Sequence, residues 1–294
     1  MKTASIQEKI TAEIINLIEK GVQAGESALW KAGQANGMPR NYKTGKPYSG
    51  VNVVMLWAAA MAKGYSDNRW LTFKQAQELG AHVRAGAKGT MGVFFQMLEA
   101  KQGEGDESSE GESGKMIPMM KPFWLFNVAD IENLPAEAVE EQIPFAANEA
   151  AEQIIAKSGA KIAWDSAQAF YSPSQDTIKM PPRENFYKPE NAYAVALHEL
   201  THWTGHKSRL DRDFTGRFGS ESYAFEELVA ELGASFLCAH IGLKNVEMEH
   251  HASYIQSWLR VLKNDSKAIF TASRHASAAY QFVLKQCGME DANA

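Results

Sequence analysis

Residues 192–203 read Ala-Tyr-Ala-Val-Ala-Leu-His-Glu-Leu-Thr-His-Trp and contain an HExxH motif at positions 198–202. Residues four apart lie on one face of an α-helix, so the imidazoles of His198 and His202 can bind one metal ion. Glu199 projects beside them, where its carboxylate can take a proton from metal-bound water. The apolar neighbours predict a buried helix, in which an unpaired carboxylate without a function would be costly. The stretch therefore predicts a hydrolytic metal site.

The third ligand does not follow from the motif itself. Catalytic zinc usually takes three protein ligands and keeps one position open for water. Gly205 occupies the glycine position of the metzincin pattern H-E-x-x-H-x-x-G-x-x-H, but Ser208 stands where that pattern has its third histidine. His206 lies too early for the pattern, and Gly205 indicates that the helix ends before it.

A second helix, expected at about residues 223–240, supplies better candidates. Glu227 and Glu231 are four apart on one face of a largely apolar helix. In the gluzincin arrangement, a Glu on a second helix completes the site and an acid four residues later orients a histidine. We assign Glu227 as the ligand and Glu231 as the orienting acid, with Glu226 as the alternate ligand. One Zn²⁺ per chain is expected, with another divalent metal as the alternative.

The expected chemistry is peptide hydrolysis. Zinc lowers the pKa of its bound water to about 7, so that Glu199 can remove a proton before attack on a carbonyl polarised by the metal. A nearby donor would stabilise the oxyanion. Three candidates, which the sequence does not separate, are Tyr223, Tyr254 and His275.

Length and composition set the broad class. The chain has 294 residues, 45% of them hydrophobic and 22% charged, which favours a globular protein of two domains. No apolar run is long enough to cross a membrane, and the N-terminus lacks the apolar core of a signal peptide. Cys238 and Cys287 form no disulfide framework and are expected to be core thiols. These features point to the cytoplasm and to no membrane partner.

The order of expected elements is that of an α+β protein. The first domain is assigned to residues 1–135, with helices at 5–25 and 51–63, a short helix capped by Thr72, and a hairpin of strands 92–97 and 122–128. Trp57 is expected in its core. Between those strands, residues 101–115 are acidic and rich in Gly and Ser, which predicts a disordered insertion.

The second domain, assigned to residues 145–294, is expected to have a zincin-like fold of the gluzincin type. A helix at 148–158 precedes strands at 161–164, 170–173 and 176–180, and the HExxH helix follows. The strand at 176–180 is hypothesised to pair with an extended peptide substrate.

The first domain has the composition of a nucleic-acid-binding module. Residues 1–101 contain 13 Lys and Arg against 7 Asp and Glu, a net charge of +6 in a chain whose total is −5. From Trp30 to Lys88, cations alternate with aromatic residues, as single-stranded nucleic acid requires. Double-stranded DNA is expected to bind more weakly, because no helix-turn-helix or zinc-finger pattern occurs. The residues predicted to contact DNA are Arg40, Asn41, Tyr42, Lys43, Thr44, Lys46, Tyr48, Asn52, Arg69, Trp70, Lys74, Gln75 and Lys88.

Several strings make the chain resemble the ArdC family of plasmid antirestriction proteins. In the first domain the resemblance is carried by residues 39–52, Pro-Arg-Asn-Tyr-Lys-Thr-Gly-Lys-Pro-Tyr-Ser-Gly-Val-Asn, and by Trp-Leu-Thr-Phe-Lys-Gln-Ala at 70–76. In the second it is carried by Met-Pro-Pro at 180–182, His-Glu-Leu-Thr-His-Trp-Thr-Gly-His at 198–206, Arg-Leu-Asp-Arg at 209–212 and Glu-Glu-Leu-Val-Ala-Glu at 226–231.

The resemblance implies an N-terminal domain that binds single-stranded DNA and a zincin-like metallopeptidase domain. It also implies protection of entering DNA from the recipient's restriction enzymes during conjugation. Two alternatives stay open: a DNA-binding protein whose metal site is structural or inactive, and a DNA-tethered protease that acts on an unrelated protein. A nuclease is disfavoured, because HExxH with one Glu builds a mononuclear site, whereas many nucleases use two metals held by carboxylates.

Overall fold

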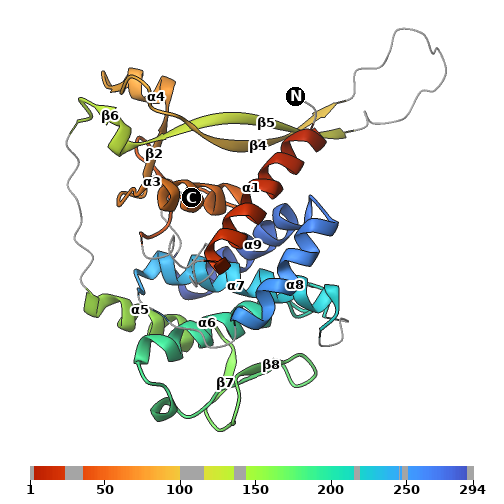
Figure 1. Cartoon of the computed structure of the whole chain (residues 1–294). Coiled ribbons are helices and arrows are strands. Elements are labelled where there is room, and N and C mark those ends of the chain that lie inside the picture. The colour runs from red at the N-terminus through yellow and green to blue at the C-terminus, as the bar shows by residue number, and fades with distance from the viewer. Residues whose placement is uncertain are drawn as a thin grey trace, which may run out of the picture.

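The computed structural model describes residues 3–23, 36–99, 116–135, 144–214, 219–244, 246 and 251–289 (Figure 1). The fold is α+β, as predicted, with an N-terminal part built around a four-stranded sheet and a mainly helical C-terminal part. Two predictions fall outside the described residues: the acidic insertion at 101–115 and the boundary between residues 135 and 145. That boundary stays a prediction.

The N-terminal sheet has the order β1-β2-β5-β4. Its strands are β1 (Arg40–Asn41), β2 (Arg69–Thr72), β4 (Thr90–Glu99) and β5 (Met116–Asn127). β1 is parallel to β2, whereas β5 is antiparallel to both β2 and β4. The expected hairpin is confirmed and is longer than predicted, with Thr90 opposite Leu125 and Glu99 opposite Met116. Figure 1 shows this hairpin crossing over the helices beneath it.

Short elements complete this part. Helix α4 (Phe73–Glu78) begins as predicted at Thr72, whose hydroxyl accepts from the Gln75 main chain while the Gln75 side chain accepts from the Thr72 main chain. β3 (His82–Val83) pairs with β6 (Ile131–Glu132). β6 directly follows the short 3-10 helix η1 (Val128–Asp130). Helix α3 (Val51–Lys63) has the predicted bounds and buries Trp57.

Helix α1 (Thr3–Gln23) joins the two parts of the molecule. Ile6, Ile10, Ile14 and Ile18 form a fully buried stripe at a spacing of four residues. This stripe belongs to the same hydrophobic core as Trp258 of helix α8 (His251–Asn264). The Thr11 hydroxyl donates to the Ser266 main chain at 2.7 Å, and Lys263 pairs with Glu19 at 2.6 Å. One continuous core therefore spans both parts.

The C-terminal part begins with α5 (Pro144–Lys157) and a small sheet of β7 (Lys161–Ala163), β8 (Phe170–Ser172) and β9 (Thr177–Lys179). The order is β7-β9-β8, so β9 is paired on both edges. The hypothesis that residues 176–180 pair with a substrate is therefore wrong, because their main-chain groups already bond to β7 and β8. The outer strands of this sheet are β7 and β8, and its free edges belong to them.

Helices form the rest of this part. After the turn η2 (Arg183–Asn185) come α6 (Pro189–Thr204), α7 (Glu221–Ile241), α8 and α9 (Ala268–Cys287). Cys238 and Cys287 are buried free thiols, as expected. Among the described residues, no helix combines the length and apolar character that crossing a membrane requires.

Candidate metal centre and nucleic-acid interface

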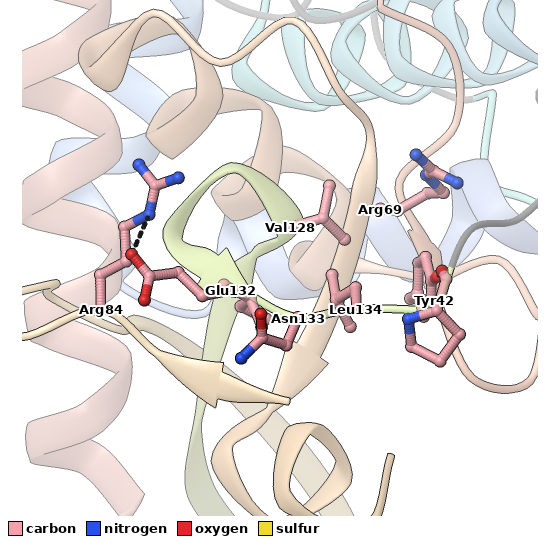
Figure 2. Close-up of a pocket in the computed structure, with 9 residues that line it drawn as sticks. Tyr42, Arg69, Arg84, Val128, Glu132, Asn133 and Leu134 are labelled. Carbon is pink, nitrogen blue, oxygen red and sulfur yellow. Dashed lines mark hydrogen bonds and ion pairs between the residues drawn. The ribbon is translucent and has the colours of Figure 1, made fainter. Parts of the chain in front are cut away.

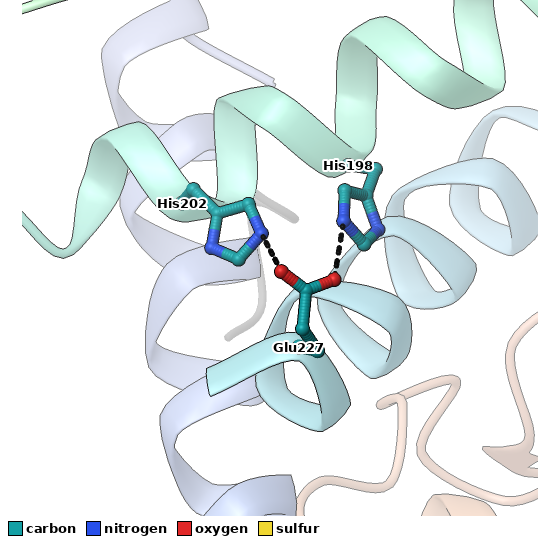
Figure 3. A group of neighbouring side chains, drawn as sticks. All are labelled: His198, His202 and Glu227. Carbon is teal, nitrogen blue, oxygen red and sulfur yellow. Dashed lines mark ion pairs between the residues drawn. The ribbon is translucent and has the colours of Figure 1, made fainter. Parts of the chain in front are cut away.

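Helices α6 and α7 bring two imidazoles and a carboxylate to one point (Figure 3). Pro189 at the first position of α6 starts the helix that carries His198 and His202 on one face. Glu227 comes from α7, with its carboxylate oxygens 3.5 Å from Nε2 of His198 and 3.5 Å from Nε2 of His202. The three ligand atoms lie within 4.8 Å of one another. The structure thus brings together the three residues assigned as metal ligands.

A close contact between the two helices makes this geometry possible. Gly233 of α7 faces Thr201 of α6, and a Cβ at Gly233 would lie 2.5 Å from Cγ2 of Thr201. Thr201 is fully buried and donates its hydroxyl to the Leu197 main chain at 2.9 Å. The missing side chain lets α7 approach α6 closely enough for Glu227 to reach both histidines.

A carboxylate lies behind each histidine. Glu226 is 3.1 Å from Nδ1 of His202, and Glu231 is 3.8 Å from Nδ1 of His198. Both Nε2 atoms therefore face the shared space in front of Glu227. Glu231 lies where an orienting acid was predicted, whereas Glu226, the alternate ligand, is directed to the far side of His202.

The donor set fits a divalent metal ion. Two imidazole nitrogens and one carboxylate, each histidine backed by an acid, are ligands typical of a mononuclear zinc site. Burial opposes a charge on His202, but its contacts with Glu226 and Glu227 raise the pKa of His202 to about 10. Burial alone would raise the pKa of Glu227, yet hydrogen bonds from His198 and His202 bring it below its usual value. The carboxylates thus favour positive charge at this point, which a metal ion would supply.

Arg212 is a buried residue whose contribution sequence reasoning missed. Its guanidinium donates to both oxygens of Glu226, at 2.9 and 3.0 Å, and to the Thr201 main chain at 2.6 Å. It also lies against Gly205, where a Cβ would be 2.8 Å from the guanidinium carbon. Arg212 therefore neutralises the acid behind His202. Residues 209–212 had been recognised as a string, but burial of a cation beside Glu226 is not readable from spacing.

Arg209 connects the small sheet to the end of α6 through an ion pair, a hydrogen bond and a cation–π contact. It pairs with Asp176, donates to the Trp203 main chain at 2.7 Å and lies 3.9 Å above the Trp203 ring. Asp176 also accepts from the Tyr171 hydroxyl at 2.8 Å. This cluster holds β8 beside α6.

Glu199 lies next to the metal-binding group and is nearly buried. Burial raises the pKa of its carboxyl, while the two histidines and a main-chain hydrogen bond from Tyr171 oppose that shift. Tyr171 belongs to β8, so a free edge of the small sheet borders the acid that was predicted to take the proton.

The candidate oxyanion donors lie in different surroundings. The hydroxyls of Tyr223 and Tyr254 are 3.2 Å apart, and burial together with hydrogen bonds to Tyr254 and Glu227 raises the pKa of Tyr223. His275 instead packs its ring edge-on against Phe225, with the centroids 6.4 Å apart. The two tyrosines thus lie near Glu227, whereas His275 lies against Phe225; all three stay predicted donors.

Several residues predicted to contact DNA hold the N-terminal part together. Trp70 is 1% exposed and Tyr42 is 6% exposed, so neither ring can stack on a base. Asn41 accepts from the main chains of Lys43 and Thr44 at 3.0 Å each and donates to Gln75 at 3.0 Å. Burial thus excludes base stacking by Trp70 and Tyr42, whereas Asn41 and Gln75 are partly exposed and stay predicted DNA contacts.

Asn52, another residue predicted to contact DNA, also has a structural role. Its side-chain amide donates to the Val93 main chain at 2.9 Å and accepts from it at 2.8 Å, so it pairs with the open edge of β4. Tyr48 is half-buried, and burial raises the pKa of its hydroxyl to about 12. Arg69 pairs with Asp67 at 2.7 Å. The remaining candidates are exposed: Arg40, Lys43, Thr44, Lys46, Lys74 and Lys88.

A cavity of about 590 Å³ opens between β1, β2 and the segment after η1 (Figure 2). Arg84 stands at one end of it and Arg69 and Tyr42 at the other, with Asn133 and Leu134 between them. Arg84 lies 3.4 Å from Glu132, so each arginine of this cavity has an acidic partner. That pairing makes the cavity a poor phosphate site.

Both parts of the chain match protein families that are already known. Residues 4–126 match the N-terminal domain of the anti-restriction factor ArdC, and residues 149–275 match a zincin-like metallopeptidase. The solved structure of metal-free antirestriction ArdC protein from R388 plasmid is 38% identical and superposes with a TM-score of 0.80, covering 97% of this chain and 98% of that chain. Its Mn(II)-bound structure gives 37% identity and a TM-score of 0.78, covering 97% and 99%.

Curated relatives include longer proteins. DNA primase TraC of Escherichia coli is 38% identical over 291 residues, which cover 94% of this chain and 27% of TraC. Uncharacterized protein y4eC of Sinorhizobium fredii (strain NBRC 101917 / NGR234) is 38% identical over 279 residues, covering 92% of this chain and 89% of that protein. The chain thus spans about a quarter of the length of this TraC.

The contact between α6 and α7 predicts the effect of a single added methyl group. Gly233→Ala should lower the free energy of unfolding by about 1–3 kcal/mol, because the new Cβ overlaps Cγ2 of Thr201. Denaturant unfolding of the metal-free protein measures this loss. Thr201→Ser removes Cγ2 but keeps the hydroxyl, so the double variant should regain part of the loss. An equal loss in both variants would mean that this contact does not limit the approach of the helices.

Arg212 should govern metal affinity without touching the metal. Arg212→Met removes the hydrogen bonds that hold Glu226 behind His202, so His202 loses its orienting acid and affinity for Zn²⁺ should fall on the order of 10- to 100-fold in a chelator competition. The double variant Arg212→Met, Glu226→Gln removes both charges and should recover thermal stability. Unchanged affinity in a folded Arg212→Met variant would contradict the role of Arg212.

Proposed function

The chain belongs to the ArdC family of antirestriction proteins, and we propose that it binds single-stranded DNA and carries a zinc-dependent peptidase site. The observation that carries the peptidase proposal is the convergence of His198, His202 and Glu227 beside Glu199. His198, His202 and Glu227 would hold one Zn²⁺, with Mn²⁺ or another divalent ion as the alternative.

The bound metal would polarise a peptide carbonyl and acidify a water molecule. Glu199 would accept the proton from that water and pass it to the leaving amine, a task for which burial and a raised pKa suit its carboxyl. Tyr223 and Tyr254 would donate to the oxyanion, since their hydroxyls lie together beside Glu227. The open edge of β8, whose Tyr171 amide already faces Glu199, would align an extended peptide.

We propose that the cellular role is protection of entering plasmid DNA from restriction during conjugation. Family membership supports this role, and the similarity to a protein of plasmid R388 agrees with it. The protein cleaved would be one that meets the entering single strand. DNA binding by the N-terminal part would bring the peptidase site to it.

A second candidate is protection by DNA binding alone, with a metal site that only stabilises the fold. The burial of Glu199 and the hydrogen bond between Tyr223 and Glu227 favour it, because a substrate would have to displace the tyrosine. The two candidates differ in whether Glu199 is needed.

The variant Glu199→Gln distinguishes the peptidase function from protection by DNA binding alone. The variant should keep its metal but lose protection, measured as transfer of unmodified plasmid DNA into a restricting recipient. His202→Ala is the matched control, which should lose both metal and protection. Full protection by Glu199→Gln with full metal content would favour DNA binding alone.

Binding to DNA should depend steeply on salt. The full chain is expected to bind labelled oligo-dT more tightly than duplex DNA, with affinity falling by about 0.7 in log K per log salt for each phosphate contacted. Fluorescence anisotropy across a salt series measures the slope. Binding that ignores ionic strength would remove the electrostatic part of the proposal.

A further inference from the structure

Two exposed aromatic rings lie close together, one on the N-terminal sheet and one on the helix that follows β2. Phe73 of α4 is 50% exposed and Trp124 of β5 is 54% exposed. Most other large apolar side chains of this part are buried, so such exposure on neighbouring elements needs a reason.

The rings are joined into a strip by their neighbours. Phe73 of α4 meets Phe126 of β5 edge-on, with the centroids 6.5 Å apart. Trp124 lies two residues from Phe126 and so projects from the same face of β5. Gly89 lies against both, since a Cβ there would be 3.1 Å from the Trp124 Cβ and 3.1 Å from the Phe126 ring. The missing side chain leaves the aromatic surface uncovered.

Each of the two exposed rings also has a lysine near it in the sequence. Lys74 follows Phe73, and Lys88 precedes Gly89, which lies against Trp124. Within the described part of the chain, Lys88 has no ion-pair partner, and Lys74 lies 3.9 Å from Glu78. The strip therefore combines rings with cations, rather than forming a purely apolar patch.

We propose that Phe73 and Trp124 form the surface on which successive bases of single-stranded DNA stack, with Lys74 and Lys88 on the phosphates. Rings that stack on bases and cations that follow the backbone are the two components of sequence-tolerant single-strand binding. This inference rests on the proposed function and locates its DNA surface. It replaces the buried rings of Tyr42 and Trp70, which cannot reach a base.

The test uses the full chain and oligo-dT in an anisotropy titration. Trp124→Ala and Phe73→Ala should each weaken binding on the order of tenfold while the slope against log salt stays the same, because a ring contributes no counterion release. Trp124→Phe should retain most of the affinity. Tyr187→Ala is the matched control, since Tyr187 is 90% exposed but belongs to the C-terminal part.

The lysines should behave differently from the rings. Lys74→Ala and Lys88→Ala should weaken binding and also reduce the salt slope by about 0.7 each. Because all these side chains are exposed, melting temperatures should stay at the wild-type value, which separates lost contacts from lost folding.

Three outcomes would overturn the inference in distinguishable ways. Wild-type protein that fails to bind oligo-dT would remove the proposed function and this surface with it. Wild-type binding with unchanged affinity in the Trp124 and Phe73 variants would place the DNA elsewhere and leave the proposed function standing. A wild-type dimer that Trp124→Ala converts to a monomer in sedimentation would show that the strip binds a second copy of the chain.

Discussion

The contact of Gly233 with Thr201 is the constraint on which the candidate metal centre depends. A glutamate side chain is short, so Glu227 can lie 3.5 Å from two imidazoles only if the axes of α6 and α7 are close. A residue with a Cβ at 233 would push α7 outward and withdraw Glu226, Glu227 and Glu231 together. The same contact buries Thr201, whose main-chain oxygen receives Arg212. The absence of a side chain at Gly233 thus sets the position of the predicted ligand Glu227 and of the two acids behind the histidines, Glu226 and Glu231.

The charges around the two histidines are not symmetric. Glu226 behind His202 is bonded by Arg212, whereas Glu231 behind His198 lies fully buried near Cys238, whose thiol pKa burial and this acid raise. The two histidines therefore have different surroundings on the side away from Glu227, although both come from one helical motif.

Helical periodicity was sufficient to predict the metal-binding group, because residues four apart on a helix share a face whatever else the fold does. Spacing alone could not do the same for the sheet. Trp70 and Trp124 both lie in strands, and which of them is buried depends on α3 covering one side of the sheet, a long-range contact. The order β7-β9-β8 is likewise a matter of pairing between distant strands, so a free edge was assigned to the wrong strand. His275 was proposed from its residue type, and only the packing of α9 placed it against Phe225.

The isoleucine stripe of α1 has a consequence for how this unit is inherited. Ile6, Ile10, Ile14 and Ile18 complete a core that otherwise consists largely of helices more than two hundred residues later. Truncation at either end would expose that core, so neither half is a free-standing module. In relatives such as TraC, where the matching region is 27% of a longer polypeptide, the unit has to be carried or lost as a whole. Recombination within it would be selected against by folding alone, which would keep the DNA surface and the metal centre genetically linked even if they never acted together.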